Sequence, residues 1–447
     1  MASARSEEHS AGLAQPLSPK RIVAATIRVL WSAMRWVTPR ALRGKVRDWL
    51  LRQVQPKPLR KARHFFFATG SSPNRWKDFG INIIGYMRSE VGLGEAARGL
   101  ARAAAHAGID TALIDVSDCY LSRMAEEPPQ ATAPEARYDV NLIHLQPPEM
   151  INPLLALRYR LRSKAYNIGY WFWETTDFPD AWIPAFDMLD ELWVASSFCL
   201  DVFSRKSPVP VIRIPLCVEP LPPAQLSRDH FRLPPTGFIF LSMCDFFSTP
   251  ERKNPMGAIE AFQRAFASRS EDTYLVLKVN NSGHRPEMQR LLRRIAEADS
   301  TIILIDGYLT RPELNALISC CDCLVSLHRS EGFGLPMAEA MYFGRPSIAT
   351  GWSANRDFMT MDNSLLVRYS LIPVSEGKGP FSDYTGLWAD PDLDHAAHLM
   401  RKLAGDTSLA GELALAAQKT IREDFSAAAV GELMRNRLAF IRKYLGP

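Results

Sequence analysis

The sequence has no uninterrupted apolar run near the roughly 18 residues that a membrane-spanning helix needs. Within residues 1–30 it also lacks the compact apolar core and small-residue cleavage site of a signal peptide, so export is not expected. Its seven cysteines are odd in number and lie in apolar runs or at element ends, not at the regular spacing of a disulfide framework. Together these absences favour a reduced, cytosolic setting.

Signals for metal and nucleic-acid binding are absent from the sequence as well. Cys320, Cys321 and Cys323 form a cluster, but no second pair of ligands stands at zinc spacing, which favours a packing role. No groove-reading motif accompanies the basic residues. His144 lies inside an apolar run, which favours a hydrogen-bonded core histidine over an active-site role. We therefore expect neither a metal nor a nucleic acid among the ligands.

The composition is that of a globular protein whose positive charge is unevenly placed. With 447 residues, of which 47% are apolar, the chain exceeds the size that one hydrophobic core supports, and two domains are expected. Residues 1–63 hold 14 Lys and Arg against 3 Asp and Glu, whereas residues 64–447 hold 39 against 45. The net charge of +5 therefore comes from a local basic segment.

That basic segment interleaves arginines with apolar residues. The spacing predicts one amphipathic helix before Pro39 and a second one over residues 41–54. Tryptophan and leucine opposite arginine are typical of a helix that lies in an anionic membrane surface; a loosely helical or disordered leader is the alternative. The Gly-Ser-Ser-Pro-Asn cluster within residues 64–78 indicates a linker. We therefore assign residues 1–78 to a basic leader and linker.

Residues 79–225 are predicted to form a first α/β domain. Residues 81–110 indicate an apolar strand, a loop that contains Gly92 and Gly94, and an alanine-rich helix. Ligands of open α/β sheets bind at such a loop, and the helix N-terminus favours anions, although a plain tight turn is the alternative. Glu174 directly follows a later strand and is either a pocket-lining carboxylate or a solvated loop acid. The further strands are predicted at 140–146, 166–173, 191–197 and 209–216.

A proline-rich stretch at residues 220–237 indicates an inter-domain linker, and residues 226–425 are assigned to a second α/β domain. The first helix of this domain is predicted to begin at Pro255. Arg252 and Lys253 therefore lie at the mouth of a strand-to-helix turn. Two cations beside the positive end of a helix gain little structurally, so a bound polyanion such as a diphosphate explains them better.

The stretch SEGFGLPMAEAMYFGRP, residues 330–346, carries the most specific pattern. It follows a predicted strand, and a short helix is predicted over residues 336–343. Glu331 then lies at the end of the strand, and Glu339 lies about one turn into the helix. The side chains of both are expected to point into one crevice. Between them, the N–H groups near Gly334 to Met337 are free donors for phosphate oxygens. Carboxylates repel phosphate but accept hydrogen bonds from sugar hydroxyls, so this arrangement indicates a nucleotide sugar.

With Glu331 and Glu339 in the pattern EGFGLPMAEAM followed by GRP, the sequence resembles retaining glycosyltransferases of the GT-B fold. It is similar in particular to the family 4 group (glycosyl transferases group 1), which carries a Glu-x7-Glu signature. The resemblance covers residues 80–435 and implies two Rossmann-like, doubly wound domains that face a central cleft. The acceptor would bind mostly to the first domain and the donor mostly to the second. A last helix, residues 426–447, would cross back to the first domain.

The resemblance also implies roles for single residues. Glu339 would hold the ribose hydroxyls, and Glu331 would lie by the donor sugar. Lys253, with Arg252 beside it, would neutralise the diphosphate. Many relatives carry a histidine near the reacting centre, and Glu174 is expected to take its positioning role here. The remaining donor-binding residues implied by the resemblance are Gly332, Phe333, Gly334, Leu335, Pro336, Gly94 and Gly92.

The implied activity is transfer of a sugar, with retention, from a UDP- or GDP-sugar to a hydroxyl of a glycan or glycolipid, as in cell-surface polysaccharide biosynthesis. Such enzymes usually need no metal and no cofactor, because cationic side chains and helix dipoles stabilise the departing diphosphate. The protein is expected in the cytoplasm and peripherally on the inner membrane, through residues 1–63. A non-catalytic GT-B interaction module and an epimerase or phosphorylase on the same fold are the alternatives.

Overall fold

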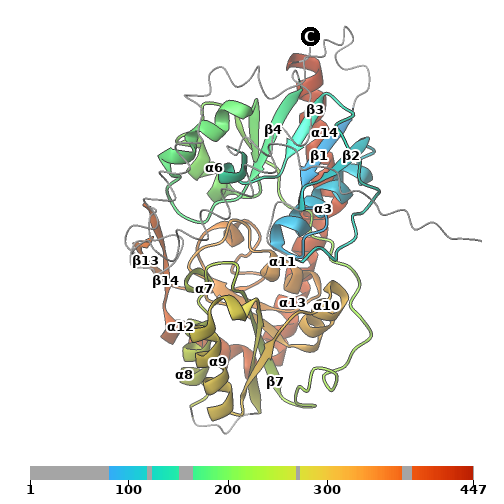
Figure 1. Cartoon of the computed structure of the whole chain (residues 1–447). Helices are drawn as coiled ribbons and strands as arrows, with labels where there is room; N and C mark the ends of the chain where they lie inside the picture. The colour runs from blue at the N-terminus through green and yellow to red at the C-terminus, as the bar shows by residue number, and fades with distance from the viewer. Residues whose placement is uncertain (1–79, 118–122, 151–164, 268–271, 375–384, 446–447) are drawn as a thin grey trace, which may run out of the picture. The chain divides into compact units, whose positions relative to one another are not determined.

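A computed structural model of the chain describes residues 80–117, 123–150, 165–267, 272–374 and 385–445 (Figure 1). Every helix and strand discussed below belongs to one compact unit within residues 60–447. The amphipathic helices and linker predicted for residues 1–78 lie outside the described residues. Within the described part of the chain, no helix is both long and apolar enough to cross a membrane.

The first of two six-stranded sheets is wholly parallel, with the strand order β2-β1-β3-β4-β5-β6. The order reverses at β1, so the carboxyl ends of β1 and β3 flank a topological switch point. Strands β1, β3 and β5 are buried along their whole length, as in parallel sheets that are covered on both faces. The strands are β1 (Ile81–Gly85), β2 (Thr111–Asp115), β3 (Val140–Ile143), β4 (Tyr166–Trp171), β5 (Glu191–Val194) and β6 (Val211–Arg213).

The second sheet is also parallel and has the order β12-β11-β10-β7-β8-β9. The chain runs outward from β7 to β9 and then returns to β10 on the other side of β7, which makes the gap between β7 and β10 its switch point. Two doubly wound, Rossmann-like domains are therefore confirmed. The strands are β7 (Phe238–Asp245), β8 (Thr273–Asn280), β9 (Ile302–Asp306), β10 (Cys323–Ser326), β11 (Ser347–Thr350) and β12 (Leu365–Val367).

Helices connect the parallel strands, and several begin at a residue whose side chain caps the helix. Asn254 accepts a hydrogen bond from the Gly257 N–H, and Thr310 forms a capping box with Glu313. The α-helices are α3 (Gly92–His106), α4 (Pro147–Met150), α6 (Ser197–Ser204), α7 (Pro250–Lys253), α8 (Pro255–Ala265), α9 (Pro286–Ala298), α10 (Arg311–Cys320), α11 (Leu335–Tyr342), α12 (Leu393–Ala404), α13 (Thr407–Asp424) and α14 (Ala427–Phe440). The 3₁₀ segments η4 (Asp180–Met188), η5 (Ser282–His284) and η6 (Ala354–Asp357) and the π-helical η8 (Ile441–Leu445) complete the set.

A separate antiparallel pair, β13 (Tyr369–Pro373) and β14 (Leu387–Pro391), extends from the second domain to the first. The Thr176 N–H donates to the carbonyl of Leu387 at 3.3 Å. The Thr385 hydroxyl donates to the carboxylate of Asp177 at 2.5 Å. These contacts fix the loop that follows β4, which is the loop that carries Glu174.

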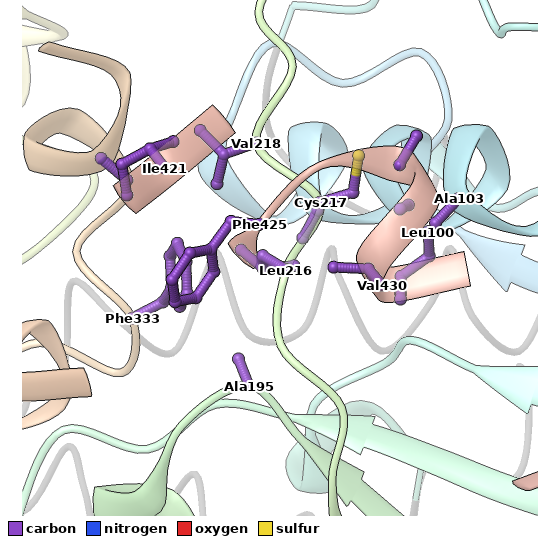
Figure 2. Packing of buried hydrophobic residues seen from close by; sticks show 14 of the residues in the cluster. Leu100, Ala103, Ala195, Leu216, Cys217, Val218, Phe333, Ile421, Phe425 and Val430 are labelled. Atoms are coloured by element: carbon purple, nitrogen blue, oxygen red, sulfur yellow. The ribbon is translucent and has the colours of Figure 1, made fainter. Parts of the chain in front are cut away.

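One hydrophobic cluster contains residues of both domains and includes the turn that precedes α11 (Figure 2). Phe333 from this turn is buried, and the centre of its ring lies 5.4 Å from that of Phe358 and 6.0 Å from that of Phe425. Phe425 stands at the junction of α13 and α14. The turn that the sequence analysis assigned to the functional site is therefore stabilised by aromatic side chains that pack against Phe333.

The C-terminal region forms two helices that meet at Phe425 and Ser426, where the sequence pattern predicted helix throughout. Ser426 interrupts the run because its side chain caps α14 by accepting from the Ala429 N–H. Helix α14 packs against α3 of the first domain. Further along α14, the guanidinium of Arg437 forms an ion pair with the fully buried Glu191 of β5 at 2.5 Å. The C-terminal helix is thus held to the first sheet by packing and by charge.

Gly431 is the point of closest approach between α14 and α3. A Cβ atom at this position would lie 2.3 Å from the carbonyl oxygen of Ala103. We expect Gly431→Ala to lower the free energy of unfolding by about 1–3 kcal/mol, the usual cost of overpacking a tight contact. Urea unfolding followed by tryptophan fluorescence measures this loss. Gly411→Ala, at a helical glycine with open space around it, is the control, and equal midpoints for both variants would contradict the prediction.

Several local predictions were wrong at element boundaries. Gly92 and Gly94 do not lie in a loop but in the first turn of α3, where the carbonyls of Ser89 and Tyr86 leave no room for a side chain at Gly94. The loop predicted before Pro255 contains the short helix α7. Helix α11 begins at Leu335, one residue before the predicted start, because Gly334 adopts a left-handed conformation and is the N-cap residue.

Candidate active site

The candidate site lies where β7 and β10 end, at the switch point of the second sheet. From β7 the chain leads into α7, whose last residues are Arg252 and Lys253, and from β10 it leads into the turn that carries Glu331. Ligands of open α/β sheets bind outside the carboxyl ends of the strands at such a point. The topology of the sheet therefore brings together three of the charged residues that the sequence analysis selected.

Glu331 is almost fully buried and binds both cations. The Lys253 ammonium lies 2.5 Å from one carboxylate oxygen, and the Arg252 guanidinium lies 3.2 Å from the other. Burial alone would raise the pKa of Glu331, but Lys253, Arg252 and His328 outweigh it and lower this pKa to about 2. Glu331 is therefore ionised at neutral pH. Together with its two partners it carries a net charge of +1, which the Glu174 carboxylate, 3.8 Å from Arg252, offsets.

Arg252 is more deeply buried than Lys253 and joins the two domains. Its guanidinium donates to the carbonyl of Ser330 at 2.7 Å, and Glu174 of the first domain lies 3.8 Å from it. Burial lowers the pKa of Arg252, but Glu331 and Glu174 more than offset this and raise it. Within the described chain, the Arg252 Nε and the Ser330 hydroxyl are buried without a hydrogen-bond partner. Such groups are rare in folded proteins and mark places where a ligand can bind.

Glu339 lies in a different charge cluster from Glu331. It is 2% exposed on α11, and its carboxylate pairs with the guanidinium of Arg311, the first residue of α10. Each of the two glutamates therefore already binds a cation. Sequence reasoning missed Arg311. Its place at the positive end of a helix, where a cation is unfavourable, was the available signal.

The turn between the two glutamates depends on two glycines. Gly334 has a φ of 101°, which favours glycine, and caps α11. Gly332 lies against the end of β4: a Cβ atom there would be 3.0 Å from the side chain of Phe172, and the Gly332 carbonyl accepts from the Ser196 hydroxyl at 3.0 Å. The turn is thus built to lie directly against the first domain.

The backbone donors of this turn are only partly available. Among the described residues, the N–H groups of Gly334 and Leu335 donate no backbone hydrogen bond. The Met337 N–H, which was predicted to be free, donates to the Gly334 carbonyl at 3.1 Å, and Pro336 has no N–H. The side chain of Phe333 packs in the core. Two amides near the positive end of α11 therefore remain for an anion.

The predicted phosphate loop of the first domain has acidic surroundings. Gly94 is packed so closely that a Cβ atom would lie 2.2 Å from the Ser89 carbonyl, whereas Gly92 is exposed. Glu95 follows directly and pairs with Arg98 at 3.0 Å and Arg102 at 2.6 Å. Burial raises the pKa of Glu95, but nearby arginines, Arg311 among them, lower it to about 2. An ionised carboxylate therefore stands one residue beyond the proposed phosphate contacts.

His144 is a buried, hydrogen-bonded core residue, as predicted. Its ring nitrogens lie 2.8 Å from the Tyr170 carbonyl oxygen and 3.0 Å from that of Leu93. Burial lowers the pKa of His144. The ring thus ties β3 to β4 and to the start of α3.

The described residues contain no group of three or more His, Cys, Asp or Glu side chains placed to hold a metal ion. Cys320, Cys321 and Cys323 are free thiols, and the last two are buried. Burial raises the pKa of the Cys321 thiol, which keeps it protonated and unreactive. The three cysteines therefore act as packing residues at the end of α10 and the start of β10.

Residues 239–371, which contain Arg252, Lys253 and the Glu331–Glu339 turn, match the sequence model of the family described as glycosyl transferases group 1. The serotype-specific mannosyltransferase WbdA of Escherichia coli is 31% identical over 131 residues. That match spans 28% of this chain and 15% of WbdA, so it concerns a small part of that protein.

Solved structures resemble this chain over a larger part of its length. Sucrose-phosphate synthase from Thermosynechococcus elongatus is 16% identical, with a TM-score of 0.57, and the match covers 81% of this chain and 99% of that one. Alr3699/HepE of Anabaena, in complex with UDP and glucose, is 13% identical, with a TM-score of 0.58 and coverage of 81% and 100%. Against TarM of Staphylococcus aureus the TM-score is 0.50 at 15% identity, and the match covers 67% of this chain and 55% of TarM. These likenesses show the GT-B fold, as predicted.

Proposed function

We propose that this protein is a glycosyltransferase that transfers a sugar, with retention, from a UDP- or GDP-sugar to a hydroxyl of a glycan or glycolipid, in cell-surface polysaccharide biosynthesis. The observation that carries this proposal is the cluster of Lys253, Arg252 and Glu331 at the switch point of the second sheet, next to two unpartnered amides. Cations and amides suit a diphosphate, and carboxylates suit sugar hydroxyls. The match to the glycosyl transferases group 1 model supports the same reading, as does the UDP in the Anabaena neighbour.

In this proposal the second domain binds the donor. Lys253 is the accessible cation and neutralises the diphosphate, while the N–H groups of Gly334 and Leu335 donate to its oxygens. Glu331 accepts hydrogen bonds from the donor sugar and holds Lys253 in place. Arg252 is too buried to move freely, so it positions Glu331 and Ser330 and offers its Nε to the ligand. Glu339 accepts hydrogen bonds from the ribose hydroxyls.

The reaction itself breaks the bond between the anomeric carbon and the diphosphate oxygen. The acceptor hydroxyl attacks from the same face, which retains the configuration, and its proton passes to the departing phosphate oxygen. The protein contributes positive charge where negative charge develops, which is the largest single factor in many enzymes. The reaction as written needs no metal or other cofactor.

We propose that residues 79–225 bind the acceptor and residues 226–425 bind the donor. Glu174 is the first domain's contribution to the reacting centre, because it lies 3.8 Å from Arg252 across the domain boundary. The first-turn amides of α3, at Gly92 and Gly94, are proposed to meet the diphosphate from the opposite side. Peripheral attachment to the cytoplasmic face of the membrane through residues 1–63 remains part of the proposal.

The test combines ligand binding with turnover. In a thermal-shift panel of UDP, GDP and ADP with their sugars, a ligand at about 100 times its Kd should stabilise the protein by about 2.7 kcal/mol. We expect one nucleotide to stabilise the wild type and Glu339→Gln to weaken its binding about tenfold, because a hydrogen bond to a charged group is lost. Titration calorimetry with the best ligand measures the change.

Glu287→Gln, at an exposed position in the first turn of α9 in the same domain, is the control and should bind like the wild type. Release of free nucleoside diphosphate only when an acceptor glycan is present separates a transferase from an epimerase. The absence of binding to every nucleotide in the panel would refute the donor site and favour a non-catalytic module.

A further inference from the structure

Lys278 is a buried lysine that binds uncharged oxygens. It lies near the end of β8 and is 3% exposed. Its ammonium donates to the Gly307 carbonyl at 2.5 Å, to the side-chain oxygen of Asn280 at 2.5 Å and to the Val279 carbonyl at 3.2 Å. The three donors of an ammonium group thus have three acceptors, none of which is a carboxylate. The position of the side chain is therefore fixed by these bonds.

The charge of Lys278 lowers the stability of the fold at neutral pH. Burial lowers the pKa of Lys278 to about 8, although Asp245 and Asp306 act in the opposite direction. Because the unfolded value is 10.5, the unfolded chain binds more protons between about pH 8 and pH 10.5, and the ionised lysine costs stability below that range. A methionine would fill a similar volume without this cost. Packing alone therefore does not explain a lysine at this position.

The contact with Gly307 fixes the loop between β9 and α10. Gly307 directly follows β9 and has a φ of 141°, which favours glycine. Its N–H donates to the Val279 carbonyl at 3.1 Å, and its carbonyl accepts from Lys278, so both polar groups of Gly307 bind the end of β8. Thr310 then caps α10. The short loop is thus held by β8 at one end and by a helix cap at the other.

The residue after this loop is Arg311, whose guanidinium pairs with Glu339. Lys278 lies on the same face of the sheet as α10. Side chains alternate between the two faces of a strand, and Val276, two residues before Lys278, belongs to the same hydrophobic cluster as Leu317 of α10. Lys278 therefore supports the start of α10 from the face of the sheet that α10 covers.

We propose that Lys278 is a positioning residue for the nucleoside half of the donor. By fixing the loop at residues 307–310 it places Arg311 beside Glu339, and so it orients the carboxylate that accepts from the ribose hydroxyls. This inference rests on the proposed function, because it requires a nucleoside diphosphate at Glu339. The diphosphate half is proposed to bind Lys253 and the amides before α11, at the ends of β7 and β10. Lys278 therefore contributes to binding of the nucleoside and not to binding of the diphosphate.

The experiment compares two ligands, the nucleoside diphosphate that binds best in the panel and inorganic pyrophosphate, which has no nucleoside. Titration calorimetry measures the Kd of the nucleotide, and displacement of the nucleotide by pyrophosphate gives the second Kd. We expect Lys278→Met to raise the Kd of the nucleotide about tenfold, because the hydrogen bonds from a charged group to the loop are lost. The Kd of pyrophosphate should stay at the wild-type value.

Val279→Ala is the matched control, because it removes buried apolar volume from the same strand on the opposite face of the sheet. It tests whether a less stable β8 alone changes the ratio of the two Kd values, and we expect no change. Asn280→Ala removes one acceptor of the Lys278 ammonium and should change the ratio in the same direction by a smaller factor. This variant provides the test if Lys278→Met does not fold.

The outcomes separate the inference from the proposed function. Equal losses for nucleotide and pyrophosphate in Lys278→Met, or no loss for either, would overturn the inference and leave the donor site in place. A change of the ratio in Val279→Ala as large as in Lys278→Met would overturn it as well, since strand stability would then be the cause. If the wild type binds none of the nucleotides, the proposed function fails, and the inference fails with it.

Discussion

Replacing Lys253 with methionine is expected to reduce kcat/KM for sugar transfer by about 10²–10³-fold, the usual effect of removing one group that stabilises charge in a transition state. Lys253 is the accessible cation of the cluster, and its partner Glu331 cannot stabilise a leaving diphosphate. Methionine keeps the length of the apolar stem but removes the charge. Initial rates of nucleoside diphosphate release in the presence of acceptor measure the loss.

The loss should appear mainly in kcat, because negative charge on the leaving group grows as the glycosidic bond breaks. Lys402→Met is the control, since Lys402 is exposed in the last turn of α12 and makes no contact with the site. The Lys253 variant should remain folded, because Arg252 still pairs with Glu331. Unchanged turnover in this variant would remove Lys253 from the mechanism.

The fold was predictable where burial alone determines the structure. Buried parallel strands need apolar side chains on both faces, so each appears in the sequence as a short apolar run. The run at residues 140–146 nevertheless predicted a strand that ends three residues too late. His144 and Leu145 are buried after β3 has ended at Ile143, and the His144 N–H still donates to the Ile84 carbonyl at 2.8 Å, so burial continues beyond the strand itself.

The charged partners of the site were predictable only in part. Arg252 and Lys253 follow one strand and Glu331 follows another, so a doubly wound order was enough to bring them together. No such rule connects Arg311 with Glu339, or Arg252 with Glu174, because these pairs depend on how helix starts and loops from different elements meet. The sequence analysis treated Glu339 as a free acceptor for this reason, whereas the structure gives it a buried cation.

The same limit explains the glycines of the first domain. The segment with Gly92 and Gly94 was predicted to be a loop because glycine is unfavourable inside helices. Gly94 is nevertheless required in the first turn of α3, where the carbonyls of Ser89 and Tyr86 leave no room for a side chain. A close contact between two backbone segments produces no periodic pattern in the sequence. The sequence therefore shows where a glycine stands but not which contact requires it.

Replacing Glu331 with glutamine is expected to have the second large effect, a loss of transfer of about 10²-fold or more at neutral pH. Glutamine has nearly the same shape, but it leaves Lys253 and Arg252 without the anion that holds them. Lys253 then reorients, whereas the buried Arg252 keeps its hydrogen bond to the Ser330 carbonyl, and the donor sugar loses a charged acceptor. Steady-state rates with saturating donor measure this change, and Glu260→Gln, at an exposed position of α8, is the matched control.

The same substitution should also change how stability depends on pH. The pKa of Glu331 is lowered to about 2 in the folded protein from an unfolded value of 4.5, so its contribution is complete above pH 4.5 and is lost as the pH falls toward 2. A lowering of the pKa by this amount corresponds to a contribution of about 3 kcal/mol to the free energy of unfolding at neutral pH. The wild type should therefore exceed Glu331→Gln in urea midpoint at pH 7, and this difference should narrow below pH 4.5. If the difference in urea midpoint between the wild type and Glu331→Gln stays constant from pH 7 to pH 3.5, Glu331 is not stabilised by its two cations. The proposed role of this charge cluster in the mechanism would then be wrong.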